Sequence, residues 1–353
     1  MPQGSILGPL LFIIYINDLP EISKLAKFIF FADDASIIIT GVDIAEIIHK
    51  LNSILPQLEN WVNLNGLKMN LKKTKYMIFS NKPTEDIQIT IASTNIERTI
   101  EERFLGVTMD SKLCWTAHRQ KLASKLSRNA GILHMLRGIV PLNVIKTLYS
   151  SFIQSHLFYC PTVWGLGSKS SLDRIFSAQK KAIRTTLANS VNYYYDSQTG
   201  KLPEHTKPIF NNNNMLTVHN IIYMQTLALL QKVHNNIAPI MIRNLFEVST
   251  QANPTKIRAV KEETFFKVPK TNKKALDNTI FVKGPKIFNK TATEFNRSLK
   301  INNQKKLSEP LFQNKFTDPF KRSIKHTILN SQNSNNTNEW HIENFPMYTH
   351  VQN

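Results

Sequence analysis

Hydrophobic positions in the first third of the chain follow the spacing of a helix twice. The first helical segment extends over about residues 7–17, where Pro9 suits the first turn. The second begins near Asp43 and Glu46, whose spacing is typical of an N-terminal capping box. Its apolar stripe continues to Asn65-Gly66, a pair that commonly ends helices. The pattern therefore predicts two helices with a shorter, different segment between them.

That intervening segment has the composition of a β-hairpin. Two runs rich in β-branched and aromatic residues, at about 27–32 and 35–40, flank the acidic pair Asp33-Asp34. We expect the two runs to pair as antiparallel strands, with both aspartates in the turn. Because both runs are almost continuously apolar, we also expect both faces of the hairpin to be covered.

The rest of the chain changes from short strands to helices near residue 110. A loop or inserted segment is expected over about 191–207, and a Ser/Asn/Gln/Thr-rich stretch at 331–338 cannot bury a core. The expected strands are 76–80, 87–91 and 104–109, and the expected helices are 117–137, 142–158, 171–187 and 215–235.

The charge of the chain is strongly positive and unevenly placed. The 353 residues include 44 Lys and Arg against 25 Asp and Glu, a net charge of +19. Residues 1–110 hold 10 basic and 13 acidic residues, so the remainder holds 34 and 12, a net +22. Such an excess favours a polyanionic partner such as nucleic acid, because phosphate neutralisation releases counterions. The alternative is a basic protein whose charge only prevents aggregation.

Composition also excludes several classes of protein. An apolar content of 42% with 20% charged residues is typical of a folded chain long enough for two or three compact units. Cys114 and Cys160 are the only cysteines and form no zinc-site spacing, which favours a reducing compartment. The apolar run at 6–16 is too short to span a bilayer. We therefore expect no membrane association and an intracellular location, nuclear or cytoplasmic or both.

Asp33-Asp34 is the candidate chemical site. Two adjacent carboxylates between apolar strands repel each other, and a buried pair of this kind needs a cation. Magnesium is suitable because it binds carboxylate and phosphate oxygens together, which would allow in-line phosphoryl transfer. The alternative is a structural turn, since aspartate favours turns by bonding to its own backbone. No third carboxylate is evident, because Asp18 and Asp43 both have the positions of helix-end residues.

The chain contains the strings PQGSILGPL at 2–10, YINDLP at 15–20 and FADD at 31–34. Together these strings specifically resemble the reverse transcriptases of non-LTR (LINE-type) retrotransposons, most closely the jockey-like arthropod branch. The resemblance is dense up to about residue 190 and thin from there to about 325. Its further motifs are Trp61, NGLKMN at 65–70, KKTK at 72–75, FLGV at 104–107 with Asp110, Tyr149, Tyr159-Cys160, VWG at 163–165, QKKAIR at 179–184 and GPKIFN at 284–289.

The resemblance implies a set of site residues at matching positions. Asp33 and Asp34 would be catalytic and would hold Mg²⁺ or Mn²⁺. Lys73 would neutralise the leaving phosphate or donate a proton to it, although a solvated lysine in a basic turn is an equal alternative.

Four further residues would contact nucleotide or template. Phe31 and Ala32 would line the nucleotide pocket. Gln3 and Gly4 would approach the template base and the incoming nucleotide, where glycine allows close backbone contact. The implied partners are an RNA template, a DNA primer and deoxynucleoside triphosphates.

The fold implied by the resemblance is α+β, a truncated right-hand polymerase palm followed by a helical thumb. The carboxy-terminal part of the palm would occupy 1–110 and a helical thumb-like region 111–190. A basic, mostly helical region would occupy 191–330, followed by a flexible tail at 331–353.

One member of the family's catalytic set has no counterpart in the sequence. The family's first catalytic aspartate lies on a strand upstream of PQGS, and the missing strands should leave apolar surface and a strand edge exposed. We therefore expect a polymerase fragment that is inactive by itself. The alternative function is a non-catalytic nucleic-acid-binding protein derived from such an element.

Overall fold

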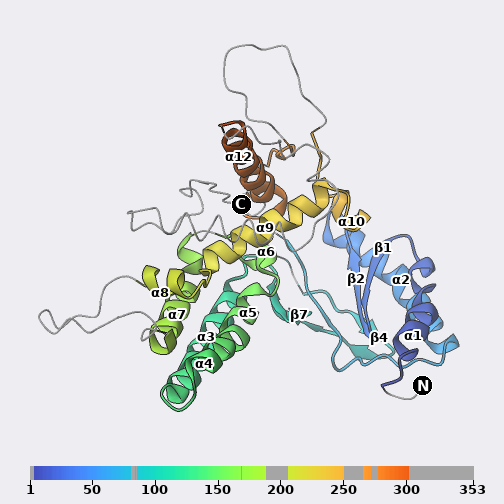
Figure 1. Ribbon diagram of the computed structural model, residues 1–353. Helices are drawn as coiled ribbons and strands as arrows, with labels where there is room; N and C mark the ends of the chain where they lie inside the picture. The colour runs from blue at the N-terminus through green and yellow to red at the C-terminus, as the bar shows by residue number, and fades with distance from the viewer. Residues whose placement is uncertain are drawn as a thin grey trace, which may run out of the picture. The chain divides into compact units, whose positions relative to one another are not determined.

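The computed structural model describes residues 4–80, 84, 86–167, 169–187, 206–249, 265–271 and 277–301 (Figure 1). It divides into two compact units, Met1–Glu102 with Asp110–Lys112, and Arg103–Met109 with Leu113–Asn353. The expected tail at 331–353 and most of the expected loop at 191–207 lie outside the described residues.

The two helices predicted for the first unit are confirmed. Helix α1 comprises Gly8–Ile16 and is followed by the 3-10 helix η1, Leu19–Ile22; α2 comprises Ile44–Leu64. The predicted capping box at the start of α2 is present, because the Asp43 carboxylate accepts a hydrogen bond from the Glu46 amide at 2.8 Å. The Glu46 carboxylate accepts one from the Val42 amide at 2.7 Å. Gly66, with φ +63°, ends the helix as expected.

Helix α2 is the centre of the first unit and has a core on each of two sides. One core joins it to α1, η1 and the hairpin through Ile16, Leu19, Leu58, Trp61 and Val62. The other consists of Ile89, Ile91 and Ile96, with Leu51 and Leu55 of α2 packed against them.

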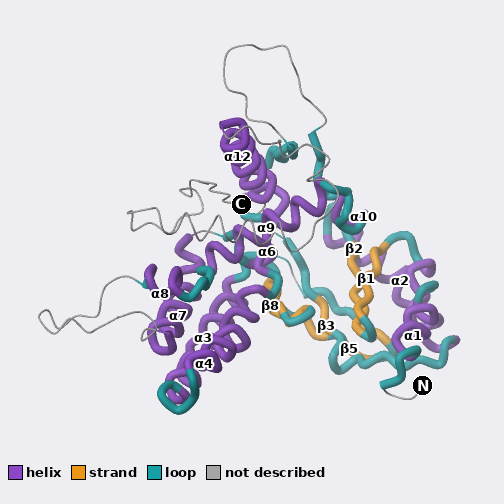
Figure 2. Tube along the Cα trace, in the orientation of Figure 1, coloured by secondary structure: helices purple, strands orange, loops and turns teal. Residues whose placement is uncertain are grey.

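The predicted hairpin is confirmed with a shift of one residue, which places Asp34 in a strand and leaves only Asp33 of the pair in the turn. Strand β1, Ala26–Phe31, pairs antiparallel with β2, Asp34–Ile39 (Figure 2). Phe31 lies opposite Asp34 in this pairing. The expectation that both faces are covered is wrong. Phe28, Phe30 and Ile37 pack on the helices, whereas the opposite face leaves Ile29, Phe31 and Ile38 exposed by 46%, 62% and 43%. The two-stranded sheet has helices on one face only within the described part of the chain.

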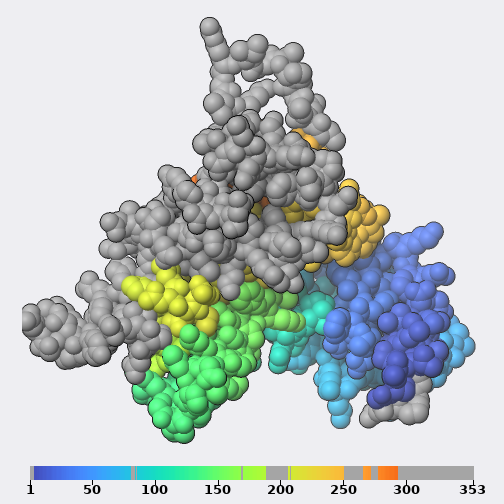
Figure 3. Space-filling model, in the orientation of Figure 1, coloured from blue at the N-terminus to red at the C-terminus, as the bar shows by residue number. Residues whose placement is uncertain are grey.

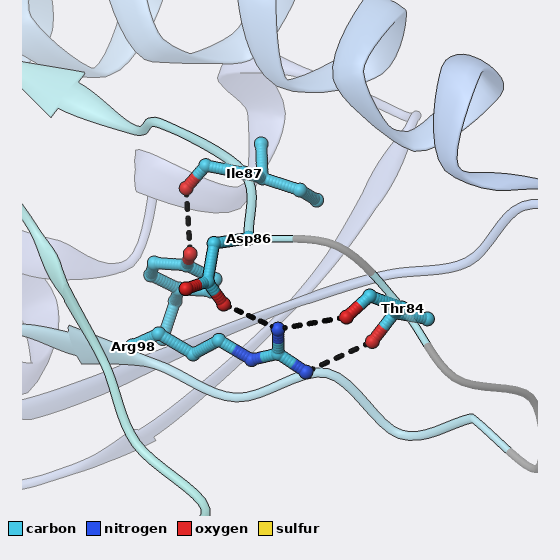
Figure 4. A network of polar contacts seen from close by, with 5 residues as sticks. Thr84, Asp86, Ile87 and Arg98 are labelled. Carbon is cyan, nitrogen blue, oxygen red and sulfur yellow. Dashed lines mark hydrogen bonds and ion pairs between the residues drawn. The ribbon is translucent and has the colours of Figure 1, made fainter.

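The remaining strands of the first unit are shorter than predicted. Strand β3, Lys75–Tyr76, pairs with β6, Glu97–Arg98, and β4, Thr90–Ile91, with β5, Thr94–Asn95. The predicted strand at 76–80 is therefore wrong beyond its first residue, and that at 87–91 holds only at its end. Side chains rather than strand pairing anchor this region: Arg98 donates to the Thr84 carbonyl and hydroxyl at 3.1 and 2.8 Å and pairs with Asp86 at 2.5 Å (Figure 4).

The predicted strand at 104–109 is two strands instead. Strand β7, Glu101–Phe104, pairs with β8, Val107–Asp110. The break lies at Leu105 and Gly106, whose φ angles are +45° and +82°. Left-handed backbone cannot continue a strand, so the chain turns there.

The second unit is helical, as predicted. The long predicted helices at 117–137, 171–187 and 215–235 correspond to α3, α7 and α9, and the one at 142–158 is a continuous helical stretch in three parts. The helices are α3 Thr116–Leu136, α4 Leu142–Tyr149, η2 Ser150–Gln154, α5 Ser155–Phe158, α6 Pro161–Trp164, α7 Lys169–Leu187, α8 Lys207–Asn212, α9 Val218–His234, α10 Ile240–Arg243 and α12 Ile280–Ile301.

Helix α9 is the buried axis of this unit, and α3 with α4 forms a projecting hairpin. Helices α5, α6, α7 and α12 pack around α9, and most of its side chains are buried. Helices α3 and α7 pack along each other, with Leu126 and Leu133 of α3 fully buried. No helix in the described part of the chain is long and apolar enough to cross a bilayer.

Candidate active site

The candidate catalytic pair lies at the tip of the β1–β2 hairpin. Phe31 and Asp34 are the last paired residues, so Ala32 and Asp33 form the turn. Ala32 has φ +52°, a left-handed conformation with which the chain turns between the two strands. Asp34 begins β2 on the face that the helices leave open, beside Phe31. All four residues are exposed.

The exposure of the pair corrects one step of the sequence argument. A buried carboxylate pair would need a cation, but exposed carboxylates are hydrated and do not. The donor set nevertheless fits a magnesium ion, which commonly keeps several waters and binds one or two carboxylates together with substrate phosphates. Among the described residues no group of three or more His, Cys, Asp or Glu side chains could hold a metal.

The other predicted site residues lie apart from the hairpin in sequence. Gln3 falls outside the described residues. Gly4 has φ +84°, a conformation that favours glycine, in the turn before α1. Lys73 is exposed in a turn closed by its own amide, which donates to the Asn70 carbonyl at 3.0 Å. Neither Gly4 nor Lys73 makes a hydrogen bond or ion pair with the hairpin among the described contacts.

Two contacts that sequence analysis missed fix the helix that follows the PQGS string. The Tyr15 hydroxyl donates to the Asn65 carbonyl, and the Trp61 indole N–H donates to the Asp18 carboxylate at 3.3 Å. Both join the end of α1 to the end of α2, beside the core that supports β1 and β2. Asp18 therefore orients a helix and is not only a helix-end residue. Both residues lie within the YINDLP string, which was the available signal.

A third set of contacts holds the turn of the β7–β8 hairpin. The Tyr159 hydroxyl donates to the Leu105 carbonyl at 2.6 Å, and the Thr108 amide donates to His118 Nδ1 at 3.2 Å. Trp164 supports both partners, because its indole N–H donates to the Tyr159 carbonyl at 2.8 Å and its ring lies 5.6 Å from that of His118. The FLGV turn thus belongs with the helices of the second unit.

The helical part of the second unit that follows this hairpin in the sequence is strongly cationic. Residues 113–187 contain eleven Lys and Arg and one acidic residue, Asp173. Burial, assisted by the charges of Arg119 and Lys121, lowers the pKa of His118 from 6.5 to about 4. The pKa of His156 is also lowered, first by burial and then by Lys125. Both imidazoles therefore stay neutral near neutral pH, and the lysines and arginines supply the positive charge.

Comparison with known proteins agrees with the motif-based interpretation. Residues 1–109 match the family described as reverse transcriptase (RNA-dependent DNA polymerase). The chain is 25% identical over 195 residues to the RNA-directed DNA polymerase from mobile element jockey of Drosophila melanogaster, a match covering 52% of the chain and 21% of the relative. The corresponding jockey protein of Drosophila funebris is 26% identical over 194 residues, with 52% and 21% covered.

A third relative comes from another element. The probable RNA-directed DNA polymerase from transposon X-element of Drosophila melanogaster is 25% identical over 192 residues, again with 52% of the chain and 21% of the relative covered. The chain thus spans about a fifth of the length of these relatives. No solved structure matches it. Residues 1–109 thus match the reverse transcriptase family, and the chain is homologous to the RNA-directed DNA polymerases of jockey-like non-LTR retrotransposons.

Proposed function

We propose that the chain is part of an RNA-directed DNA polymerase of a mobile element, one that adds deoxynucleotides to a DNA primer on an RNA template. The observation that carries this proposal is the position of Asp33 and Asp34 at an exposed hairpin tip within the region that matches the family. Carboxylates at a projecting turn are open to a primer end and a triphosphate from the solvent side. The action of such an enzyme on nucleic acid, with Cys114 and Cys160 present as thiols and not joined in a disulfide, fits an intracellular location, nuclear or cytoplasmic.

Each site residue then has a defined task. Asp33 and Asp34, together with further ligands, would hold Mg²⁺ or Mn²⁺, which would supply activation of the primer hydroxyl and stabilisation of the leaving pyrophosphate. Phe31 and Ala32 contact the incoming nucleotide from the same hairpin tip. Gly4, with Gln3, approaches the template base. Lys73 neutralises the leaving phosphate.

The two aspartates are insufficient by themselves. They lie side by side at one hairpin tip, whereas a two-metal site needs carboxylates that converge from separate segments. The described residues provide no third carboxylate there. We therefore propose that the 353-residue chain does not polymerise unless another segment contributes that ligand.

Primer extension tests both parts of the proposal. The 353-residue chain and a version extended upstream through the next strand of the encoding element are incubated with a primed RNA template, deoxynucleotides and Mg²⁺ or Mn²⁺. We expect the longer protein to extend the primer. This activity should be lost in Asp33→Asn and in Asp34→Asn, and kept in the nearby control Ser36→Ala. Activity of the short chain that is lost in Asp33→Asn would overturn the claim of insufficiency alone. Extension by the longer protein that survives Asp33→Asn would overturn the assignment of the site.

The cationic second unit has a complementary role in the same proposal. The exposed members of its eleven basic residues over 113–187 bind the phosphates of the template and primer without sequence preference. The affinity of the chain for nucleic acid is expected to fall steeply as salt rises from about 50 to about 200 mM. An affinity independent of salt would contradict this role.

A further inference from the structure

Helix α3 carries a continuous exposed stripe that changes in character along its length. The stripe consists of Lys121, Lys125, Arg128, Ile132 and Met135, spaced four and three residues apart in alternation. At 3.6 residues per turn these positions fall within an arc of about 80° and extend about 21 Å along the helix. The first three are cationic and exposed, and the last two are apolar, with Ile132 43% and Met135 68% exposed.

The apolar half of the stripe continues around the turn into α4. Ile139 is 75% exposed, and Leu142 and Val144 are 43% and 38% exposed, so five large apolar side chains gather within thirteen residues. This turn is the free end of the α3–α4 hairpin in Figure 1, and it lies open on the face shown in Figure 3. An apolar group of this size on a projecting end is typical of a contact surface.

The turn holds these side chains in a fixed position. The Ile139 amide donates to the Leu136 carbonyl at 3.1 Å, and the Val140 amide donates to the same carbonyl at 3.3 Å. Leu136 and Val140 are packed against the core of the unit. Gly138, between Leu136 and Val140, has φ +84°, a conformation that favours glycine and allows the tight turn. Because its neighbours are anchored, Ile139 projects without a large loss of freedom on binding.

The charge around the tip restricts what can cover it. Eleven cations and one carboxylate over 113–187 would repel a second copy docked tip to tip. A nucleic-acid duplex offers both chemistries in the required order: phosphates for the cationic half, and base faces for the apolar half where a step is unstacked. Proteins that bend duplexes combine basic contacts to the backbone with apolar side chains inserted between base steps.

We propose that the α3–α4 hairpin is a wedge for duplex nucleic acid, with Lys121, Lys125 and Arg128 on the backbone and Met135 and Ile139 inserted at a deformable base step. This inference rests on the proposed function of the second unit, and adds to it a preference for duplexes that are easily unstacked. Insertion at a stacked step costs a few kcal/mol of unstacking, which an unpaired bulge has already lost.

The test compares a short mixed-sequence DNA duplex with the same duplex carrying a short unpaired bulge, by fluorescence anisotropy over a salt series. The full chain is expected to bind the bulged duplex about tenfold more tightly, since tenfold corresponds to a modest part of the unstacking cost. Met135→Ser with Ile139→Ser should reduce that ratio to about one and leave the salt dependence unchanged. The matched control is Ile240→Ser with Met241→Ser, whose side chains on α10 are 60% and 77% exposed; it should keep the preference.

Charge variants separate the two halves of the stripe. Each phosphate contact contributes about 0.9 to the slope of log affinity against log salt. Replacing Lys121, Lys125 and Arg128 with glutamine should therefore reduce the magnitude of this slope by up to about 2.7 and keep the bulge preference. Salt-dependent binding with no bulge preference, or a preference that survives Met135→Ser with Ile139→Ser, would overturn the wedge and leave the proposed function intact. The second result would assign the apolar tip to a protein contact instead. Absence of binding by the unmodified chain would overturn both.

Discussion

The turn of the β7–β8 hairpin offers a quantitative test of how the second unit holds a strand motif. Gly106 has φ +82°, and a Cβ added there would lie 3.2 Å from Tyr159 Cε1 and 3.4 Å from the Tyr159 hydroxyl. The same hydroxyl donates to the Leu105 carbonyl at 2.6 Å. Gly106→Ala should therefore strain the backbone and displace the tyrosine at the same time.

The two costs can be worked out separately. A left-handed conformation costs alanine about 1–2 kcal/mol. Displacing the ring weakens the hydrogen bond to Leu105, which contributes about 1 kcal/mol. The free energy of unfolding of the second unit should thus fall by about 2–3 kcal/mol in Gly106→Ala. In a Tyr159→Ala background the ring is absent, and the same substitution should cost only about 1–2 kcal/mol.

The measurement is a double-mutant cycle by urea unfolding, followed by helical circular dichroism because the second unit holds most of the helix. The expected interaction energy between positions 106 and 159 is about 1 kcal/mol. Tyr159→Phe provides a control that keeps the ring and removes only the hydroxyl, so it should show an intermediate coupling. An equal cost of Gly106→Ala in all three backgrounds would refute the proposed contact between Tyr159 and the turn.

Two further predictions concern the same unit. The pKa of His118 in the folded chain is about 4, against 6.5 for the unperturbed group, so the unfolded chain binds the proton more readily. The free energy of unfolding should therefore fall as pH decreases from about 6.5 to about 4. Urea midpoints measured across this range should show a flatter dependence in His118→Gln, and an unchanged slope would contradict the role of His118. Leu126→Ala should cost about 2–5 kcal/mol because Leu126 is fully buried. Ile132→Ala, on the exposed side of the same helix, should lower the free energy of unfolding by less than about 1 kcal/mol in the same titration. Similar losses of stability in both variants would show that the assigned helix faces are wrong.

Local patterns were sufficient to predict the elements that local chemistry determines. The β1–β2 hairpin follows from two β-rich runs around an acidic turn, and α2 from a capping box and a terminal Asn-Gly pair. The long helices of the second unit follow from their apolar spacing. In each case the signal and the structure lie within the same few residues.

Features that depend on distant residues could not be predicted in this way. The apolar run at 35–40 does not reveal which face a helix covers, and so the open face of the hairpin was missed. The division of 104–109 into two strands depends on Leu105 in a left-handed conformation, held by Tyr159 from 54 residues away. The contact between Asp18 and Trp61 likewise spans 43 residues. Asp33 and Asp34 were identified by motif, and their exposure was not foreseeable from the strands beside them.

The backbone at the hairpin tip also restricts how the FADD string can vary. Ala32 has φ +52°, a conformation that glycine adopts freely and asparagine tolerates. Valine, isoleucine and threonine are strongly disfavoured there because their branched Cβ would crowd the adjacent carbonyl. Related sequences that share this turn should therefore accept small or turn-forming residues before the aspartates and exclude β-branched ones, whatever nucleotide they select.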